Sequence, residues 1–420
     1  MYLCSNNNVW VTSDGQLVRL ALPAAKELDL NLFVLWTNTR NSVFWVLNPD
    51  TNGIIVPNWN WWDQGSLQRF VELVWEGQPV TTEWENVPVT TLRRLENLWL
   101  IVRPLANTIE MIQDRYTEKW LVKTAGWEPV PYRPVDTFDE LRNSVWVLGL
   151  PCILKTRRMG YDGKWQWRIT EETNLDAFWN ENFKDGIPKW WLILEKMIDL
   201  DYELSVMVWM GAYNTMQMIG PIYNIHEWGT LRYSIDPAPI PEDVKIQVLQ
   251  LAEKIANWVD TKGNTWYKWL LTIEFFVDKH GKIYVNEFAP RPHNSGHASL
   301  DSRDVNQNHL WLNGVAARRL DKVSEIQHPV VMENILAQSE FAQSLDYLSR
   351  NSVADELTFY DYQKLIWTPD KNNSSVRKLW HFNHRWQVVE KLLERLNRGE
   401  IDMNYFIRSI RVIDQKSTIK

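Results

Sequence analysis

Cysteine and long apolar runs are scarce in this sequence, and each shortage excludes a class of protein. Only two of the 420 residues are cysteines, Cys4 and Cys152, which excludes a disulfide scaffold and a zinc site built from cysteines. No apolar run approaches the length of a membrane span, and the first residues, MYLCSNNNVW, lack the pattern of a signal peptide. We therefore expect a cytoplasmic protein with no membrane partner.

Charge and length narrow the class further. A net charge of −7 without any basic cluster argues against a nucleic-acid partner. A chain of 420 residues predicts roughly two or three domains with ample hydrophobic core, as in a multidomain soluble enzyme. Glycine is also scarce, with 17 residues against 26 tryptophans, and several tryptophans stand where a turn favours glycine.

The segment 270–297 carries polar side chains in an otherwise apolar setting. Two β-branched and aromatic runs flank the turn-forming residues 278–281 and predict a β-hairpin. Each run carries one carboxylate, and folding the hairpin places Glu274 across from either Asn286 or Glu287. Two carboxylates and an amide oxygen suit Mg²⁺ that substrate phosphates also bind. The alternative is a hairpin whose glutamates face solvent.

The residues after the hairpin favour a binding site. Residues 291–297, RPHNSGH, bring cationic, amide and hydroxyl groups next to the predicted metal. Together with Asn286 and Glu287 they form the run NEFAPRPHNSGH, which closely resembles the signature NEIAPRPHNSGH of 5-(carboxyamino)imidazole ribonucleotide synthase. Members of that family are ATP-grasp carboxylases of purine biosynthesis.

A second motif lies at residues 151–166, PCILKTRRMGYDGKWQ. It predicts a strand followed by a loop with two glycines, and such a loop exposes backbone N–H groups to phosphate oxygens. Lys155 and Lys164 supply positive charge. Taken alone, the segment also fits an ordinary basic hairpin. It resembles the family's KTRRGGYDGKGQ, and Met159 and Trp165 stand where the family has glycine.

The N-terminal residues predict a different local fold. A strand at 8–12, a helix at 16–28 and a strand at 31–36 are typical of a doubly wound parallel sheet. Further on, residues 82–88, TEWENVP, resemble the family's EFENVP, and this likeness implies that Glu83 and Glu85 reach the substrate cleft.

The resemblance implies a role for each residue that matches a family motif. Mg²⁺ would be held by Glu274 and Glu287. The resemblance assigns ATP binding to Arg115, Lys155, Gly160, Tyr161, Asp162, Gly163, Lys164, Gln166, Glu195, Lys196, Met197, Ile198, Glu203, His226, Asn286 and Glu287. It assigns 5-aminoimidazole ribonucleotide and bicarbonate to Glu83, Glu85, Tyr161, Asp162, Arg291, His293, Asn294, Ser295, Arg377 and Lys378. The catalytic residues it implies are Lys155, Arg291, His293 and Lys378.

The likeness extends roughly from residue 9 to residue 383 and implies a fold of α/β and α+β parts. We expect a doubly wound domain at 1–107, an ATP-grasp domain at 108–305, and a small C-terminal domain with a terminal helix at 306–420. The implied activity is ATP-dependent carboxylation of 5-aminoimidazole ribonucleotide with bicarbonate, through carboxyphosphate. The family likeness also implies a homodimer.

Three alternatives stay open at this stage. Another ATP-grasp ligase, such as the formate-dependent glycinamide ribonucleotide transformylase, would keep the metal hairpin but is matched less well by RPHNSGH. A catalytically weakened or inactive nucleotide-binding protein is suggested by the substituted glycines at 159, 165 and 380. A purely structural protein would leave both motifs without a reason.

Overall fold

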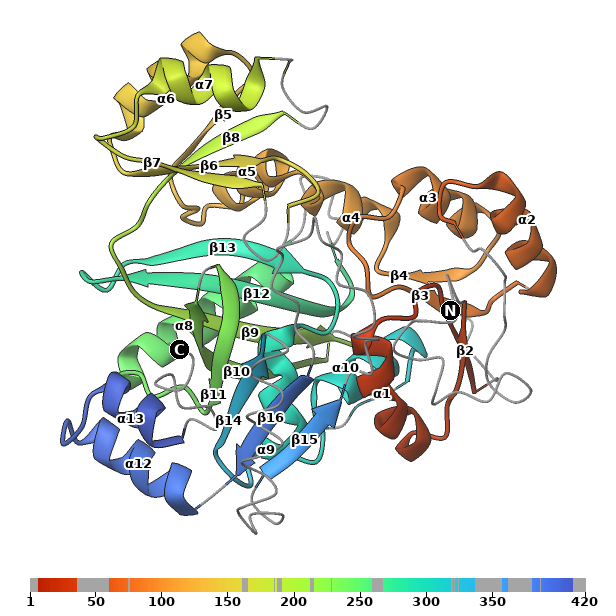
Figure 1. The fold of residues 1–420 in the computed structure, drawn as a ribbon. Coiled ribbons are helices and arrows are strands. Elements are labelled where there is room, and N and C mark those ends of the chain that lie inside the picture. Colours follow the sequence, from red (N-terminus) through yellow and green to blue (C-terminus); the bar gives the residue numbers. More distant parts are fainter. Residues whose placement is uncertain are drawn as a thin grey trace, which may run out of the picture.

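The computed structural model (Figure 1) describes residues 7–35, 60–74, 76–160, 165–184, 186, 191–211, 215–227, 229–258, 267–318, 320, 322–323, 325–336, 357–361, 380–385 and 387–410. Three groups of elements are visible in it. A small parallel sheet lies near the N-terminus, a small antiparallel sheet forms a lobe at the top of the view, and a large antiparallel sheet occupies the centre. The predicted fold class is confirmed.

The N-terminal part is a four-stranded parallel sheet in the order β2-β1-β3-β4. The predicted strand–helix–strand opening is confirmed. Residues Val9 to Val11 are buried without alternation, as in a strand covered on both faces, and the helix buries one apolar face. Its elements are β1 (Asn8–Val11), α1 (Gln16–Glu27), β2 (Asn31–Val34), α2 (Gln64–Leu73), β3 (Pro79–Thr81), α3 (Val89–Asn97), β4 (Ile101–Arg103) and α4 (Ala106–Ile112).

The small lobe is a four-stranded antiparallel sheet in the order β5-β8-β6-β7. The face turned away from the large sheet carries buried Leu154, Leu192 and Leu194, which pack against the two helices that cover it (Figure 1). The elements are α5 (Arg115–Thr124), β5 (Tyr132–Val135), α6 (Phe138–Leu148), β6 (Cys152–Thr156), β7 (Gln166–Ile169), α7 (Leu175–Phe183) and β8 (Leu192–Lys196).

The large sheet has eight strands in the order β13-β12-β9-β10-β11-β14-β16-β15. The predicted hairpin forms its first two strands. The elements of this part are β9 (Leu200–Met210), β10 (Met216–Glu227), β11 (Thr230–Asp236), α8 (Glu242–Asn257), β12 (Trp269–Asp278), β13 (Ile283–Ala289), the 3₁₀ helix Asn294–Ala298, α9 (Ser299–Ser302), α10 (Gln307–Val315), β14 (Val330–Ile335), β15 (Leu357–Asp361) and β16 (Trp380–Arg385). Strands β14 to β16 therefore continue the central sheet, and the three-domain division stays a prediction.

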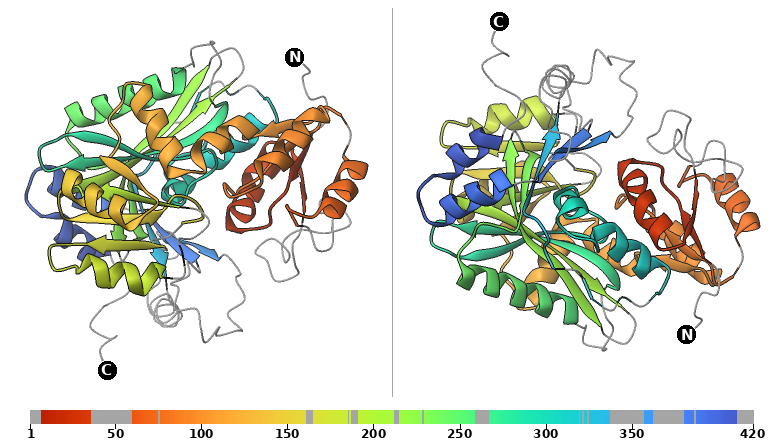
Figure 2. Two further views of the ribbon diagram at one scale, coloured as in Figure 1. Left: turned by 90° about the horizontal axis from the view of Figure 1, so that it is seen from above. Right: turned by 90° about the horizontal axis from the view of Figure 1, so that it is seen from below.

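Helix α10 joins the N-terminal part to the large sheet (Figure 2). Its Asn308 donates a hydrogen bond to the carbonyl of Leu20 on α1, at 2.8 Å. The indole N–H of Trp311 donates to Thr81 at the end of β3, at 3.1 Å. These contacts fix the ends of the parallel strands beside the central sheet.

Two helices end the described chain. The predicted terminal helix is α12 (Gln387–Asn397), while α13 (Met403–Ile410) follows it without having been predicted. Phe406 and Ile410 of α13 pack with Leu392 against the large sheet. Within the described ranges, no helix combines the length and apolar character needed to cross a membrane.

Candidate active site

A cleft of about 1130 Å³ opens where the N-terminal part, the small lobe and the large sheet meet. Its lining contains most of the predicted site residues, namely Glu83, Glu85, Arg115, Lys155, Gly160, Gln166, Glu195, Lys196, Met197, Ile198, Glu203, His226, Glu274, Asn286, Glu287, Arg291, His293 and Asn294. Residues from six separate stretches of the chain thus share one cavity. Tyr161, Asp162, Gly163, Lys164, Arg377 and Lys378 lie outside the described residues.

The two hairpin carboxylates face this cleft from neighbouring strands. Glu274 on β12 lies opposite Glu287 on β13, and a β-bulge follows directly after Glu274. The amide of Asn286 also reaches Glu274 and donates a hydrogen bond to its Oε2 at 3.3 Å. Both partners left open by the sequence are therefore near Glu274, and the solvent-facing alternative does not describe this hairpin.

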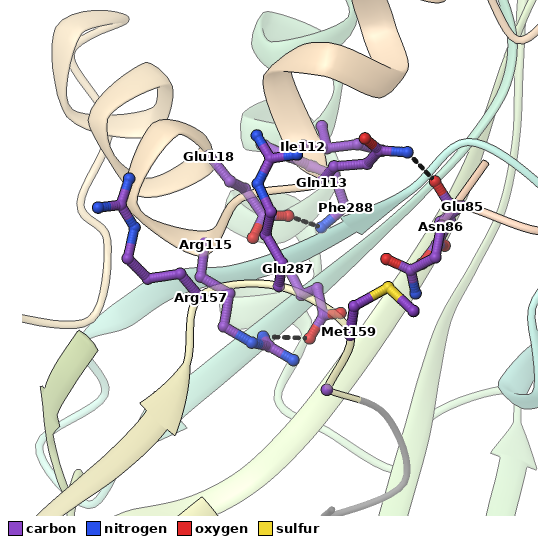
Figure 3. A pocket seen from close by; sticks show the side chains of 12 residues that line it. Glu85, Asn86, Ile112, Gln113, Arg115, Glu118, Arg157, Met159, Glu287 and Phe288 are labelled. Carbon is purple, nitrogen blue, oxygen red and sulfur yellow. Dashed lines mark hydrogen bonds and ion pairs between the residues drawn. The ribbon is translucent and has the colours of Figure 1, made fainter. Parts of the chain in front are cut away.

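A basic side chain pairs with each of the two carboxylates. Glu274 Oε1 is 3.0 Å from His293 Nε2, and Glu287 Oε2 is 3.0 Å from Arg115 Nη1 (Figure 3). Burial by itself raises the pKa of Glu274, but the hydrogen bond and charge of His293 outweigh burial and lower it to about 2. Glu287 in turn raises the pKa of Arg115. Glu274 thus presents negative charge to the cleft at neutral pH.

Lys155 on β6 belongs to a buried chain of charges that the sequence did not reveal. Its Nζ lies 2.8 Å from Glu195 Oε2 on β8, and Lys119 Nζ on α5 lies 3.4 Å from the other oxygen of Glu195. Lys119 also donates to the carbonyl of Asn286, at 3.4 Å. Burial raises the pKa of Glu195, but the two lysines outweigh it and lower this pKa to about 2. These charges link the small lobe to the hairpin of β12 and β13.

Replacing Glu195 with Gln tests this chain of charges. We expect the variant to lose about 3–5 kcal/mol of unfolding free energy at neutral pH, because two buried lysines lose their counter-charge. The folded pKa of Glu195 lies below the unfolded value, so its contribution is present above about pH 4.5 and is lost as pH falls toward about 2. Urea unfolding of both proteins between pH 7 and pH 3 measures the gap, and a gap that does not narrow on acidification contradicts the assignment.

The loop that the sequence predicts to bind phosphate begins directly after β6, at Arg157. Arg157 makes two hydrogen bonds of 2.9 Å to Asp114 at the N-terminus of α5, which ties the loop to the small lobe. Met159 and Trp165 both have left-handed backbone, with φ of 63° and 57°. Both side chains are exposed, so burial does not offset the cost of that conformation.

A buried chain of hydroxyl groups holds the ring of His293, a residue of the RPHNSGH segment. His293 Nδ1 lies 2.8 Å from Ser295 Oγ, which lies 2.7 Å from Ser205 Oγ on β9. Gln307 accepts a hydrogen bond from the backbone N–H of His293 and donates one to its carbonyl. Ser295 is fully buried and does not line the cleft, so it acts on the site by orienting the His293 ring.

Two further residues of this segment, Arg291 and Asn294, line the cleft. Arg291 Nε lies 2.9 Å from Glu85 Oε1, which links the segment to the predicted N-terminal motif. Asn294 is 7% exposed, and its buried amide nitrogen and oxygen have no hydrogen-bond partner among the described residues. A buried amide without a partner costs free energy unless a ligand satisfies it.

Glu83 takes a different position from Glu85. It accepts hydrogen bonds from the backbone N–H groups of Gly15, Leu17 and Val18 at the start of α1. A Cβ at position 15 would lie 2.0 Å from its Oε1, so a larger residue there would displace this carboxylate. Burial raises the pKa of Glu83 to about 7. Glu83 lines the cleft, and its carboxylate is bound to this helix terminus.

Two more predicted residues pair at the opposite end of the cleft. Glu203 on β9 lies 2.9 Å from His226 Nδ1 on β10. Lys196, by contrast, donates to the carbonyls of Gly149 and Leu150, at 3.1 and 3.0 Å, and so fixes the segment before β6.

Glu118 belongs to the site, although the sequence predicts no role for it. It is 2% exposed and accepts a hydrogen bond from the backbone N–H of Phe288 at 2.7 Å (Figure 3). Burial first, and then the charge of Glu287, raises its pKa well above the ordinary value. In the sequence, Glu118 and Lys119 follow Gln113-Asp114-Arg115 by one helical turn and resemble the family's QDR…EK, but without that likeness they fit an ordinary charged helix face.

Comparisons with known proteins agree with this geometry. The ATP-grasp domain profile matches residues 120–308. The chain is 30% identical over 329 residues to the N5-carboxyaminoimidazole ribonucleotide synthase of Bacillus subtilis, covering 78% of this chain and 80% of that protein. It resembles the N5-carboxyaminoimidazole synthetase of Staphylococcus aureus complexed with ADP, with a TM-score of 0.77 and 25% identity over 97% of this chain and 100% of that chain. An Aspergillus clavatus synthase, in complex with ADP and 5-aminoimidazole ribonucleotide, shares the fold with a TM-score of 0.76 at 18% identity over 97% of each chain.

Proposed function

The chain belongs to the N5-carboxyaminoimidazole ribonucleotide synthase family, and from this premise we propose how its own residues carry out the family's reaction. The enzyme carboxylates 5-aminoimidazole ribonucleotide with bicarbonate at the expense of ATP, in purine biosynthesis. One observation carries the assignment of roles. The hairpin carboxylates, Lys155 and the RPHNSGH segment all line one cleft, although they come from separate parts of the sequence.

ATP occupies the side of the cleft between the small lobe and the large sheet. Lys155 neutralises phosphate charge, while Glu195 and Lys119 behind it keep its ammonium group in place. The backbone of 195–198 provides the edge for the adenine, and Glu203 accepts hydrogen bonds from the ribose hydroxyls. Arg115 stays within reach of the phosphates through its pairing with Glu287.

Glu274 and Glu287 are the residues that would hold Mg²⁺, with the side-chain oxygen of Asn286 nearby. Oxygen ligands in register on two adjacent strands fit this ion, which commonly takes one or two protein carboxylates and completes its shell with phosphate oxygens and water. Bound there, the ion would neutralise charge on the phosphates. His293 and Arg115 pair with the two carboxylates and hold them in place.

The ribonucleotide occupies the side of the cleft formed by Glu85 and the RPHNSGH segment. Arg291 offers a planar fork of donors for a phosphate or for bicarbonate, and the unpartnered amide of Asn294 offers one donor and one acceptor. Attack of bicarbonate on the γ-phosphate gives carboxyphosphate and ADP. The amine of the ribonucleotide then takes the carboxyl group and phosphate leaves. Because carboxyphosphate decomposes in water, the closed loop has to exclude solvent.

The assay that tests this function is ADP release with and without 5-aminoimidazole ribonucleotide. We expect release to depend on both the ribonucleotide and bicarbonate. Replacing them with glycinamide ribonucleotide and formate tests the other ATP-grasp ligase. Release with that pair alone contradicts the proposed substrate, and the absence of release despite ATP binding favours the inactive nucleotide-binding alternative.

The positive φ values of Met159 and Trp165 are the specific observation that favours weakened activity. Each disfavoured backbone conformation costs about 1–3 kcal/mol, which lowers the population of the closed loop. We expect the double variant Met159→Gly/Trp165→Gly to release ADP roughly 10-fold or more faster than the parent, since about 1.4 kcal/mol corresponds to a factor of 10. If glycine slows aminoimidazole-dependent release, the loop closes in another conformation and the strain argument is wrong.

We also propose that the protein is a cytoplasmic homodimer. Two cysteines in 420 residues agree with a reducing compartment, and the family likeness supports the dimer. Sedimentation analysis of the purified protein distinguishes a dimer from a monomer.

A further inference from the structure

Tryptophan recurs in this chain at positions whose backbone is left-handed. Seven described residues other than glycine have positive φ, and four of them are tryptophans: Trp99, Trp165, Trp191 and Trp269, with φ of 61°, 57°, 48° and 87°. Asn and Asp are the residues that ordinarily accompany glycine in this region, whereas bulky residues are outliers there. Four outliers of one residue type call for a common cause.

The end of helix α3 shows what these positions require. The N–H of Trp99 donates to Glu96 and that of Leu100 donates to Leu95, which is the Schellman arrangement with Trp99 at the left-handed position. Helix α5 ends in the same arrangement. There the N–H of Gly126 donates to Lys123, the N–H of Trp127 donates to Val122, and the left-handed residue is Gly126. The same arrangement ends α12 at Gly399, α1 at Asp29 and α10 at Ala317. Among the described helix ends, glycine therefore occupies this position twice, and tryptophan is the one bulky residue found there.

The tryptophan side chains make few contacts that could offset the free-energy cost of a left-handed backbone. The side chains of Trp99, Trp165 and Trp191 are 74%, 54% and 54% exposed. Trp269 is buried, but its indole N–H has no hydrogen-bond partner among the described residues, although a buried indole usually has one. At position 165, moreover, the family motif has glycine. Arg157 lies over the Trp191 ring at 5.1 Å and Arg103 over the Trp269 ring at 4.6 Å. Such a contact contributes about 0.5–2 kcal/mol, which does not exceed the cost of about 1–3 kcal/mol for a disfavoured backbone conformation. The backbone at these four positions therefore fits glycine better than tryptophan.

The composition of the whole chain also indicates that tryptophan stands in place of glycine. Glycine commonly makes up about 7% of a protein, which is about 29 residues in a chain of this length, and only 17 are present. Tryptophan occurs 26 times, more often than phenylalanine or tyrosine. An excess of one residue beside a deficit of the other is what a replacement of glycine by tryptophan at many positions produces.

We propose that positions 99, 165, 191 and 269 carry glycine in the protein that the source organism makes. One codon is read as tryptophan in the present sequence, and the source organism decodes that codon as glycine. The codon UGA accounts for such a substitution. It is a stop in the standard code, it differs by one base from the tryptophan codon UGG, and it differs by one base from the glycine codon GGA. Met159 is not explained in this way. The inference does not depend on the proposed function, since only Trp165 lines the cleft.

Peptide mass spectrometry of the protein isolated from its source organism tests the inference directly. We expect glycine at positions 99, 165, 191 and 269. Tryptophan at these positions overturns the proposal, whatever the activity of the enzyme. The gene sequence adds a second requirement, because the four codons must be the same reassigned codon.

Recombinant variants test the structural argument separately. Trp99→Gly should raise the melting temperature by roughly 2–4 °C, and Gly126→Trp, in the matching motif, should lower it. Trp167→Gly is the control, because Trp167 lies in strand β7 and packs against Phe178 and Phe183. This control should be less stable than the parent. If Trp99→Gly destabilises the protein as Trp167→Gly does, the backbone at 99 does not require glycine and the inference fails.

Discussion

Glu274→Gln and Glu287→Gln are each expected to weaken magnesium-dependent ATP binding by at least about 10–100-fold and to abolish most ADP release. Even the loss of a hydrogen-bond partner of a metal ligand costs that much affinity, and these residues are proposed as ligands themselves. Glutamine keeps the shape of the side chain and removes its charge. Because Glu274 and Glu287 lie opposite each other on adjacent strands, either change leaves the ion with a single protein carboxylate.

Calorimetric titration with ATP in the presence and absence of Mg²⁺ measures the effect. Glu128→Gln is the matched control, since Glu128 is exposed, pairs with Lys282 beside the same hairpin and lies outside the cleft lining. Thermal unfolding shows whether each variant is folded, which matters most for Glu287 because it is the partner of Arg115. Equal magnesium-dependent affinity in the parent and in both cleft variants would remove the metal assignment.

The hairpin could be predicted from the sequence because its determinants are local. Two apolar runs and a turn of Asp, Lys, His and Gly specify β12 and β13 without help from the rest of the chain. The exact partner of Glu274 could not be predicted. A β-bulge after Glu274 shifts the register, and this bulge brings Glu287 opposite while Asn286 still reaches the carboxylate.

The charge chain behind Lys155 could not be predicted for a different reason. Lys119, Lys155 and Glu195 come from a helix and two strands, and their contacts exist only after the small lobe has packed. Each residue alone reads as an ordinary surface charge. The same holds for the chain of hydroxyl groups under His293, because Ser205 and Ser295 are 90 residues apart and look like generic polar residues.

The C-terminal region shows a third reason why part of the fold could not be predicted from the sequence. Helix α13 has a clear apolar face, with Phe406 and Ile410 buried, but eight residues are too few to distinguish a packed helix from a loop by pattern alone. Its partner is α12 and the large sheet, and this surface is defined only when β14 has joined the central strands.

Arg291→Ala is expected to weaken 5-aminoimidazole ribonucleotide binding by roughly 10–100-fold while ATP affinity stays within about 2-fold. A hydrogen bond to a charged group contributes about 1.5–3 kcal/mol, and the guanidinium fork makes two such bonds to a phosphate or carboxylate. Arg291 pairs with Glu85 on the N-terminal side of the cleft, away from the lysine at position 155. Burial raises the pKa of Glu85, which Arg291 counteracts, so the variant also leaves a buried carboxyl without its cation.

Two further variants separate the charge from the fork and one side of the cleft from the other. Arg291→Lys keeps the charge and loses the planar geometry, so we expect it to restore only part of the ribonucleotide affinity. Lys155→Ala should give the opposite selectivity, with ATP binding weakened and ribonucleotide binding retained. Arg93→Ala, an exposed arginine paired with Glu110, controls for a general loss of positive charge. Equal losses of both ligands in Arg291→Ala would mean that residues 291–297 support the cleft structurally, or that the two substrates occupy the opposite sides.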